Sequence, residues 1–211
     1  MTTETANATA DDVQAFPTAL GWMAVRGRQG RLCGLAFGHA SADEAASAVC
    51  RKVAGAVERR NWNDALVRRL QDFAAGAEVA FDDVEIVLPG EGFQRRVLEL
   101  CRRIPYGGTM SYSELAAAAG SPGAARAVGN CMARNAVPLV VPCHRVVPRG
   151  GKLGRYSAPG GVETKRRLLA MEGAIETSQQ NDQESPSTFG GEDRDARRRE
   201  GEGEKRRECK R

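Results

Sequence analysis

A cysteine and a histidine stand side by side in the segment 139–147, which reads Leu-Val-Val-Pro-Cys-His-Arg-Val-Val. Histidine is scarce in this chain of 211 residues, with only His39 and His144 present. A thiol attacks other atoms as the thiolate, and an adjacent base or positive charge favours that form. Cys143 beside His144 is therefore a candidate nucleophile with its base, although a Cys-His pair that only packs in a core would look the same in sequence.

The flanking residues decide whether this chemistry is possible. Neighbours in an extended strand face opposite ways, so contact between Cys143 and His144 requires a turn or a bridging water. Pro142 favours such a turn and holds the preceding residue extended, so we expect a strand over 139–141 that leads into Cys143. A histidine that works as a base usually has its other nitrogen held by a carboxylate or carbonyl. Glu172, at an apolar helix end, is the leading candidate, and an exposed terminal charge is the alternative.

Length and composition indicate the class of protein. The chain is 41% hydrophobic and 27% charged, which is typical of a globular protein with one large domain or two small ones. No stretch approaches the roughly 18 apolar residues that a membrane span requires, and the polar residues 1–15 lack the features of a secretory signal. We therefore expect a protein of the cytoplasm, or of the nucleus in a eukaryote, with no membrane partner.

Metal and disulfide chemistry have little support in the sequence. The six cysteines include no CxxC pair, which in a reducing compartment favours free thiols. Cys33 and His39 stand six residues apart and are each able to bind zinc, but no second pair nearby completes four ligands. We expect no metal site and no other cofactor.

The charge of the chain is unevenly distributed. Residues 176–211 hold 9 of the 31 Lys and Arg residues and 10 of the 27 Asp and Glu residues, so the rest of the chain carries a net charge of about +5. That charge is compatible with a polyanionic partner and equally with an ordinary solvated surface. The segment 176–211 itself is polar, with Phe189 as its single aromatic residue, and we expect a disordered charged tail.

The sequence of the first half predicts a small α/β domain over 13–88, after a flexible N-terminus at 1–12. This domain contains no catalytic motif, so we expect it to have a supporting role. Its expected elements are strands over 20–25 and 32–37 joined by a glycine-containing turn, helices over 41–60 and 64–76, and a strand over 84–88. The Pro-Gly cluster at 89–92 predicts a domain boundary.

The second half predicts a helical domain over 93–175. Helices are expected over 93–104, 111–119, 124–134 and 162–170, and a short glycine-containing break between the second and third gives a helix-turn-helix layout. Small residues surround Arg126 in the third of these helices. They allow close approach to nucleic acid, with the arginine reaching into it, or tight packing against another helix.

A family resemblance rests on several motifs in order. These are Tyr112, Ala125-Arg126-Ala127-Val128-Gly129, Asn135-Ala136-Val137-Pro138, Pro142-Cys143-His144-Arg145-Val146 and Tyr156-Ser157, with Phe93-Gln94 and Pro105-Tyr106-Gly107 before them. Together they resemble the methylated-DNA–protein-cysteine methyltransferases, or O6-alkylguanine-DNA alkyltransferases, from Phe93 to about Ala174. The resemblance implies an N-terminal ribonuclease-H-like α/β domain followed by a mainly helical, winged-helix-like domain that contains the helix-turn-helix.

The resemblance also implies an activity. It is the direct repair of O6-alkylguanine in double-stranded DNA, with O4-alkylthymine as a further candidate, by a monomer that transfers the methyl or alkyl group to its own cysteine once. This is the reaction of a methylated-DNA–protein-cysteine S-methyltransferase. A thioether product has no ready hydrolysis, which fits a single turnover.

Roles for individual residues follow from the matching positions. Cys143 would accept the alkyl group, while His144, through a water and Glu172, would draw off the thiol proton. Tyr112 would donate to guanine N3, and Arg126 would fill the gap left by the flipped base while Ala125 and Ala127 approach the minor groove. The remaining implied site residues are Asn135, which braces a turn, Val146 and Ser157, which contact the base, and Tyr156, which walls the pocket.

Some positions depart from the family pattern, and other functions remain to be distinguished. Leu98 stands where many members have tryptophan, Ala136 replaces a frequent proline, and Gly90-Glu91-Gly92 replaces the usual lead-in. A lesion sensor of the alkyltransferase-like type would lack the cysteine. A helix-turn-helix regulator would use Cys143 as a redox or alkylation sensor, and a cysteine hydrolase would have to work without a second histidine near the motif.

Overall fold

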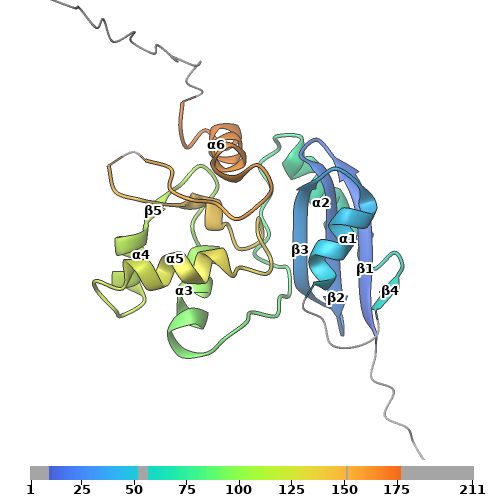
Figure 1. The fold of residues 1–211 in the computed structure, drawn as a ribbon, viewed down its shortest axis with the longest axis horizontal. Coiled ribbons are helices and arrows are strands. Elements are labelled where there is room, and N and C mark those ends of the chain that lie inside the picture. The colour runs from blue at the N-terminus through green and yellow to red at the C-terminus, as the bar shows by residue number, and fades with distance from the viewer. Residues whose placement is uncertain (1–9, 52–56, 151, 177–211) are drawn as a thin grey trace, which may run out of the picture. The chain divides into compact units, whose positions relative to one another are not determined.

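The computed structural model describes residues 10–51, 57–150 and 152–176 (Figure 1). These residues belong to one compact unit. The predicted flexible start up to residue 9 and the predicted tail after residue 176 lie outside the described residues. Among the helices that the structure describes, none is long and apolar enough to cross a membrane.

The N-terminal half is built on a four-stranded sheet with the strand order β3-β2-β1-β4. Strand β2 (Gly21–Arg28) pairs antiparallel with both β1 (Asp11–Thr18) and β3 (Arg31–His39), and β4 (Val57–Arg59) pairs parallel with β1. Helices α1 (Ala42–Cys50) and α2 (Asp64–Ala74) complete this half. The β2–β3 turn has positive φ at both Gln29 (51°) and Gly30 (77°), which matches the right-handed twist of a hairpin.

The strands predicted over 20–25 and 32–37 and the helix predicted over 64–76 are confirmed, with shorter or longer bounds. The helix predicted over 41–60 is confirmed as α1, but its predicted end is wrong because residues 57–59 form β4. Strand β1 was missed, because its apolar residues are few. It pairs with β2 and β4, and its buried Asp11 also accepts hydrogen bonds from Arg26 Nη1 at 2.5 Å and Arg28 Nε at 2.6 Å. The predicted strand over 84–88 is wrong as a strand, because it makes only an isolated bridge between Leu32 and Ile86.

The C-terminal half is mainly helical, as predicted. Its elements are α3 (Gly92–Arg102), β5 (Met110–Ser111), α4 (Tyr112–Ala118), α5 (Ala125–Ala133), the 3-10 helix η1 (Cys143–Arg145), β6 (Val146–Val147) and α6 (Gly161–Met171). Strands β5 and β6 pair in parallel, which brings the start of α4 next to the segment that follows Cys143. A capping box at Ser111 and Glu114 begins α4, as the sequence predicts.

Helices α4 and α5 form the predicted helix-turn-helix (Figure 1). The turn between them contains Gly120 (φ 77°) and Gly123 (φ 88°), where a side chain would be strained. Helix α5 buries Val128, Cys131 and Met132 and leaves Arg126 exposed. One face of α5 therefore packs in the core while the arginine remains available on the other.

The segment before Cys143 differs from its prediction. The predicted strand over 139–141 is a turn, in which Leu139 has φ 70° and the Val141 amide donates to the Val137 carbonyl at 2.9 Å. The apolar run misled the strand prediction, because a short run of this kind is equally compatible with any buried segment. The turn expected after Pro142 is present as η1.

A large hydrophobic core joins the two halves, beside a smaller cluster of β1, β2 and α1 side chains within the N-terminal half. The buried members of the large core come from the sheet, such as Phe37, and from the helical half, such as Leu98 and Leu168. The Leu35 amide of β3 also donates to the Ala136 carbonyl at 2.8 Å. The N-terminal sheet is therefore bonded directly to the segment that leads into Cys143.

Candidate active site

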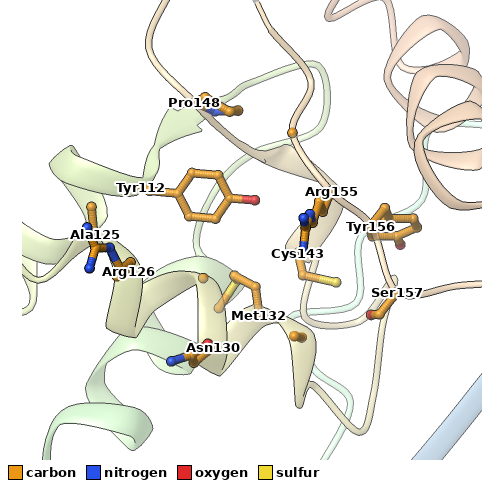
Figure 2. A pocket seen from close by; sticks show the side chains of 13 residues that line it. Tyr112, Ala125, Arg126, Asn130, Met132, Cys143, Pro148, Arg155, Tyr156 and Ser157 are labelled. Atoms are coloured by element: carbon orange, nitrogen blue, oxygen red, sulfur yellow. The ribbon is translucent and has the colours of Figure 1, made fainter. Parts of the chain in front are cut away.

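Cys143 lies at a pocket of about 650 Å³. Figure 2 shows the thiol with Tyr112 on one side and Tyr156 and Ser157 on the other, while α5 runs along the pocket with Arg126 near its start. The side chain of Cys143 is only 5% exposed. The thiol is therefore withdrawn from bulk solvent and faces a space large enough for a nucleobase.

The surroundings of Cys143 keep it protonated at rest. Burial raises the pKa of its thiol, and this effect outweighs the opposing influence of Asn135, Tyr156 and the positive charge of Lys165. Tyr156 lies close enough for its pKa to be raised by burial and by Cys143, yet its buried hydroxyl makes no hydrogen bond to the described residues that meets the usual geometric limits. A reaction at Cys143 therefore needs a base to remove the proton.

A buried network lies behind the cysteine. His144 Nε2 and Glu172 Oε1 are 2.8 Å apart, and both side chains are fully buried. Arg145 donates from Nε to Glu172 Oε2 at 2.8 Å and from Nη2 to Oε1 at 2.9 Å. A third guanidinium bond, from Nη1 to the Ile104 carbonyl, is 2.6 Å long. The structure thus joins His144 to Glu172 across 28 residues and adds Arg145 to the pair.

The network sets the protonation of the histidine. Burial opposes ionisation of Glu172, but the hydrogen bonds and charges of His144 and Arg145 outweigh it, so the pKa of Glu172 is lowered. Burial also lowers the pKa of His144, despite the neighbouring carboxylate. A neutral imidazole that donates from Nε2 to an ionised Glu172 has a free lone pair on Nδ1. That nitrogen is buried and has no partner among the described residues.

The other predicted site residues fall into two groups. Tyr112, Ala125, Arg126, Tyr156 and Ser157 all line the pocket with Cys143. Ala127 lies on α5 but outside the lining of this pocket. Burial raises the pKa of Tyr112, so its hydroxyl is a hydrogen-bond donor at neutral pH.

Asn135 and Val146 support the pocket from outside it. The Asn135 amide donates to the Val141 carbonyl at 2.7 Å and accepts from the Val137 amide at 3.1 Å, which braces the turn before Cys143. The Val146 carbonyl, which the family resemblance assigns to the base, accepts a 2.6 Å hydrogen bond from Lys165. A base contact at Val146 would have to use the second lone pair of this carbonyl.

Metal ligands do not gather at the site. Within the described ranges, no group of three or more His, Cys, Asp or Glu side chains is arranged to hold a metal ion. Cys33 donates from its thiol to the Arg26 carbonyl at 3.3 Å, so it is engaged with its own sheet.

Comparison with known proteins identifies the family. Residues 92–174 match the family described as 6-O-methylguanine DNA methyltransferase, DNA binding domain. The crystal structure of Mycobacterium tuberculosis OGT in complex with DNA superimposes with a TM-score of 0.64 and 34% identity, over 77% of this chain and 93% of that chain. This chain belongs to the O6-methylguanine-DNA methyltransferase family. The resemblance found in the sequence is confirmed.

Further members show where the similarity is concentrated. The methylated-DNA–protein-cysteine methyltransferase of Mycolicibacterium paratuberculosis is 48% identical over 106 residues, which are 50% of this chain and 62% of that protein. The Salmonella typhimurium protein of the same name is 46% identical over 107 residues, 51% of this chain and 61% of that protein. The O6-methylguanine-DNA methyltransferase from Pyrococcus kodakaraensis has a TM-score of 0.59 at 27% identity, over 77% of this chain and 99% of that chain. The aligned sequence thus spans less than two thirds of the length of the curated relatives. The structural similarity, which includes the mixed α/β fold, covers 93% and 99% of the two solved chains.

Two residues at the site of this methyltransferase-family chain have partners that the sequence did not reveal. Arg145 stands directly after His144 in the Cys-His motif, but no local signal pairs it with Glu172, which lies 27 residues further along the chain. Lys165 is fully buried, although its neighbours Arg166 and Arg167 are exposed. Its ammonium lies 5.7 Å from the Tyr112 ring centroid, and burial lowers its pKa to about 8. No local signal distinguishes Lys165 from the two arginines, because only the fold decides which side chain points inward.

Proposed function

We propose that the protein repairs O6-alkylguanine in double-stranded DNA by moving the alkyl group to Cys143, once per molecule. The observation that carries this proposal is a buried thiol at a base-sized pocket whose rim is the second helix of a helix-turn-helix. The relatives named above, which are methylated-DNA–protein-cysteine methyltransferases, support it. O4-alkylthymine is a further candidate substrate.

The proton of Cys143 follows the buried network in this mechanism. Because the thiol is protonated at rest and His144 Nδ1 has a free lone pair, a bridging water carries the proton from sulfur to the imidazole. Ionised Glu172 stabilises the imidazolium that forms, and Arg145 holds the carboxylate in place. The positive charge of Lys165 favours the thiolate at the moment of attack.

The transfer itself is a direct displacement. The sulfur of Cys143 forms a bond to the alkyl carbon while the bond from that carbon to guanine O6 breaks. The electron pair remains on the purine, where the Tyr112 hydroxyl donates to N3 and offsets the negative charge. Tyr156 walls the pocket, and Ser157 with the Val146 carbonyl contacts the base.

Helix α5 is the proposed DNA contact. Ala125, Ala127 and Gly129 present little side chain, so the helix is able to lie close in the minor groove. Arg126, exposed at the pocket edge, would enter the base stack in place of the guanine that turns into the pocket. A Cβ added at Gly129 would lie 4.0 Å from the Tyr112 ring, which is an ordinary contact distance, so packing within the protein would tolerate alanine there.

The finer description of the fold belongs to the same proposal. The strand order is β3-β2-β1-β4, β4 is parallel to β1, and α1 connects β3 to β4 along the chain. This arrangement supports a ribonuclease-H-like domain over 13–88. The helix-turn-helix with the β5–β6 pair supports a winged-helix-like domain over 93–175. We further propose a monomer, which acts where the DNA is, in the cytoplasm or in a nucleus.

Transfer of a labelled methyl group tests the function. A duplex with O6-methylguanine that carries the label on the methyl group is expected to place one label per protein molecule on Cys143. Cys143→Ser is expected to take up none, and Cys33→Ser, the matched change on β3, is expected to take up as much as the wild type. Label on Cys143→Ser, or turnover beyond one label per molecule, would overturn the proposal.

A further inference from the structure

Cys143 borders a second hollow besides the proposed base pocket. This hollow has a volume of about 400 Å³ and shares Cys143, Tyr156 and Ser157 with the first pocket. Its far wall comes from the N-terminal half, with Phe37 and His39 on β3 and Ala48 on α1. We call it the N-terminal wall pocket. The sequence alone assigned this half only a supporting role.

The wall is held firmly against the cysteine segment. The Leu35 amide of β3 donates to the Ala136 carbonyl at 2.8 Å, and Phe37 is 1% exposed. Gly38 faces the loop that carries Ser157, since a Cβ added there would lie 3.6 Å from Pro159. Helix α1 begins at a Ser41 cap, whose hydroxyl accepts the Glu44 amide at 3.2 Å. A wall bonded in this way keeps its shape when a substrate enters.

Most residues that line this pocket are apolar, among them Leu35, Phe37, Pro138, Ala158 and Pro159. Its charged or polar members are Arg51, Asn135, Ser157 and His39. Burial lowers the pKa of His39, which favours its uncharged form, so the apolar side of the pocket offers room to an alkyl group larger than methyl. A methyl group is close in size to a single water molecule, so a pocket of about 400 Å³ is larger than methyl transfer requires.

The geometry of displacement explains why such a space would be used. Guanine O6, the transferred carbon and the cysteine sulfur lie on one line during the attack. The base occupies the first pocket, so the rest of a longer alkyl chain must leave that line to the side. The N-terminal wall pocket shares Cys143 with the first pocket, so it offers such an alkyl chain a space beside the cysteine.

We propose that the N-terminal wall pocket receives the outer atoms of O6-alkyl groups larger than methyl, and that β3 and α1 thereby set which adducts the protein repairs. The substrate class is an O6-alkylguanine with an apolar chain, for which butyl is the probe. This inference rests on the proposed function and extends it, because it gives the N-terminal half a part in substrate selection.

Filling the pocket from α1 tests the inference. Ala48→Leu adds three carbons to a half-buried wall residue far along the chain from the motif. On duplexes with O6-butylguanine we expect transfer to slow by at least about tenfold, the scale of one misplaced methylene in an apolar pocket. Transfer from O6-methylguanine is expected to stay within about twofold. Ala48→Val, with a smaller side chain, is expected to give an intermediate loss on butyl alone.

The matched control is Ser47→Leu, the same apolar side chain at an exposed neighbour on α1 that does not line the pocket. It is expected to leave both rates unchanged. Equal slowing of both substrates by both Ala48 variants would mean that Ala48 only supports the fold, and an unchanged butyl rate would mean that the butyl group lies elsewhere. Either result would overturn this inference but leave the proposed function standing, provided that the wild type still transfers methyl. Loss of wild-type methyl transfer would instead refute the proposed function.

Discussion

Replacement of Glu172 by glutamine separates the structural part of the buried network from its chemical part. The carboxylate accepts three hydrogen bonds of 2.8 to 2.9 Å, two from Arg145 and one from His144. Glutamine fills nearly the same volume but offers one acceptor oxygen and adds two N–H donors. At least one of the three donors therefore loses its partner, and the charge of Arg145, which is 7% exposed, is left uncompensated.

The cost follows from that burial. Removing one member of a buried ion pair destabilises a protein by about 3–5 kcal/mol, which for a chain of this size lowers Tm by roughly 6–20 °C. The reaction should suffer separately. An amide that donates to His144 Nε2 forces the imidazole proton onto Nδ1, which is then unable to accept the thiol proton. We expect methyl transfer to fall by about 10²–10⁴-fold, the usual contribution of a general base.

The assay combines thermal unfolding with single-turnover methyl transfer, measured at a temperature where the variant is folded. Glu163→Gln is the matched control on the same helix, since its carboxylate is 72% exposed and pairs with Arg166. It is expected to change stability by less than about 0.5 kcal/mol. If folded Glu172→Gln transferred methyl within about threefold of wild type, the role of His144 as base would be refuted. If the Tm of Glu172→Gln equalled that of Glu163→Gln, the stabilising role of the network would be refuted.

Two further predictions concern the DNA contact and the buried lysine. Arg126→Ala is expected to slow repair of duplex substrate by about 10-fold or more, with little effect on free O6-benzylguanine, and equal losses on both would remove the role in base extrusion. Lys165→Met is expected to slow transfer about tenfold at neutral pH, because the cation favours the Cys143 thiolate. The pKa of Lys165 is lowered from 10.5 to about 8. At a pH between these two values, Lys165 therefore carries a proton in the unfolded chain but not in the folded chain. Raising the pH from 8 to 10.5 should therefore stabilise the wild type relative to Lys165→Met by at most about 3 kcal/mol in urea unfolding, and an identical pH dependence of the two proteins would contradict this.

Local signals predicted the helices well and the strands less well. The Ser111 and Glu114 capping box and the glycines at 120 and 123 mark the limits of α4 and α5, because these residues act on the backbone beside them. Strand β1 has no such signal, since Asp11 becomes a buried partner of Arg26 and Arg28 only once the sheet forms. The turn at Leu139 was mistaken for a strand, because an apolar run reports burial and not backbone shape.

By itself, the sequence determined the family, the helical layout of the second half and the identity of Cys143, His144 and Tyr112 as candidates, because these depend on residue type and short spacing. Only the tertiary structure decided that Glu172 reaches His144, that Lys165 and not Arg166 points inward, and that β3 and α1 line a hollow together with Cys143. Each of these depends on which face of a helix or strand is buried against a distant segment. Such contacts arise from packing across the whole core, and no local pattern encodes them.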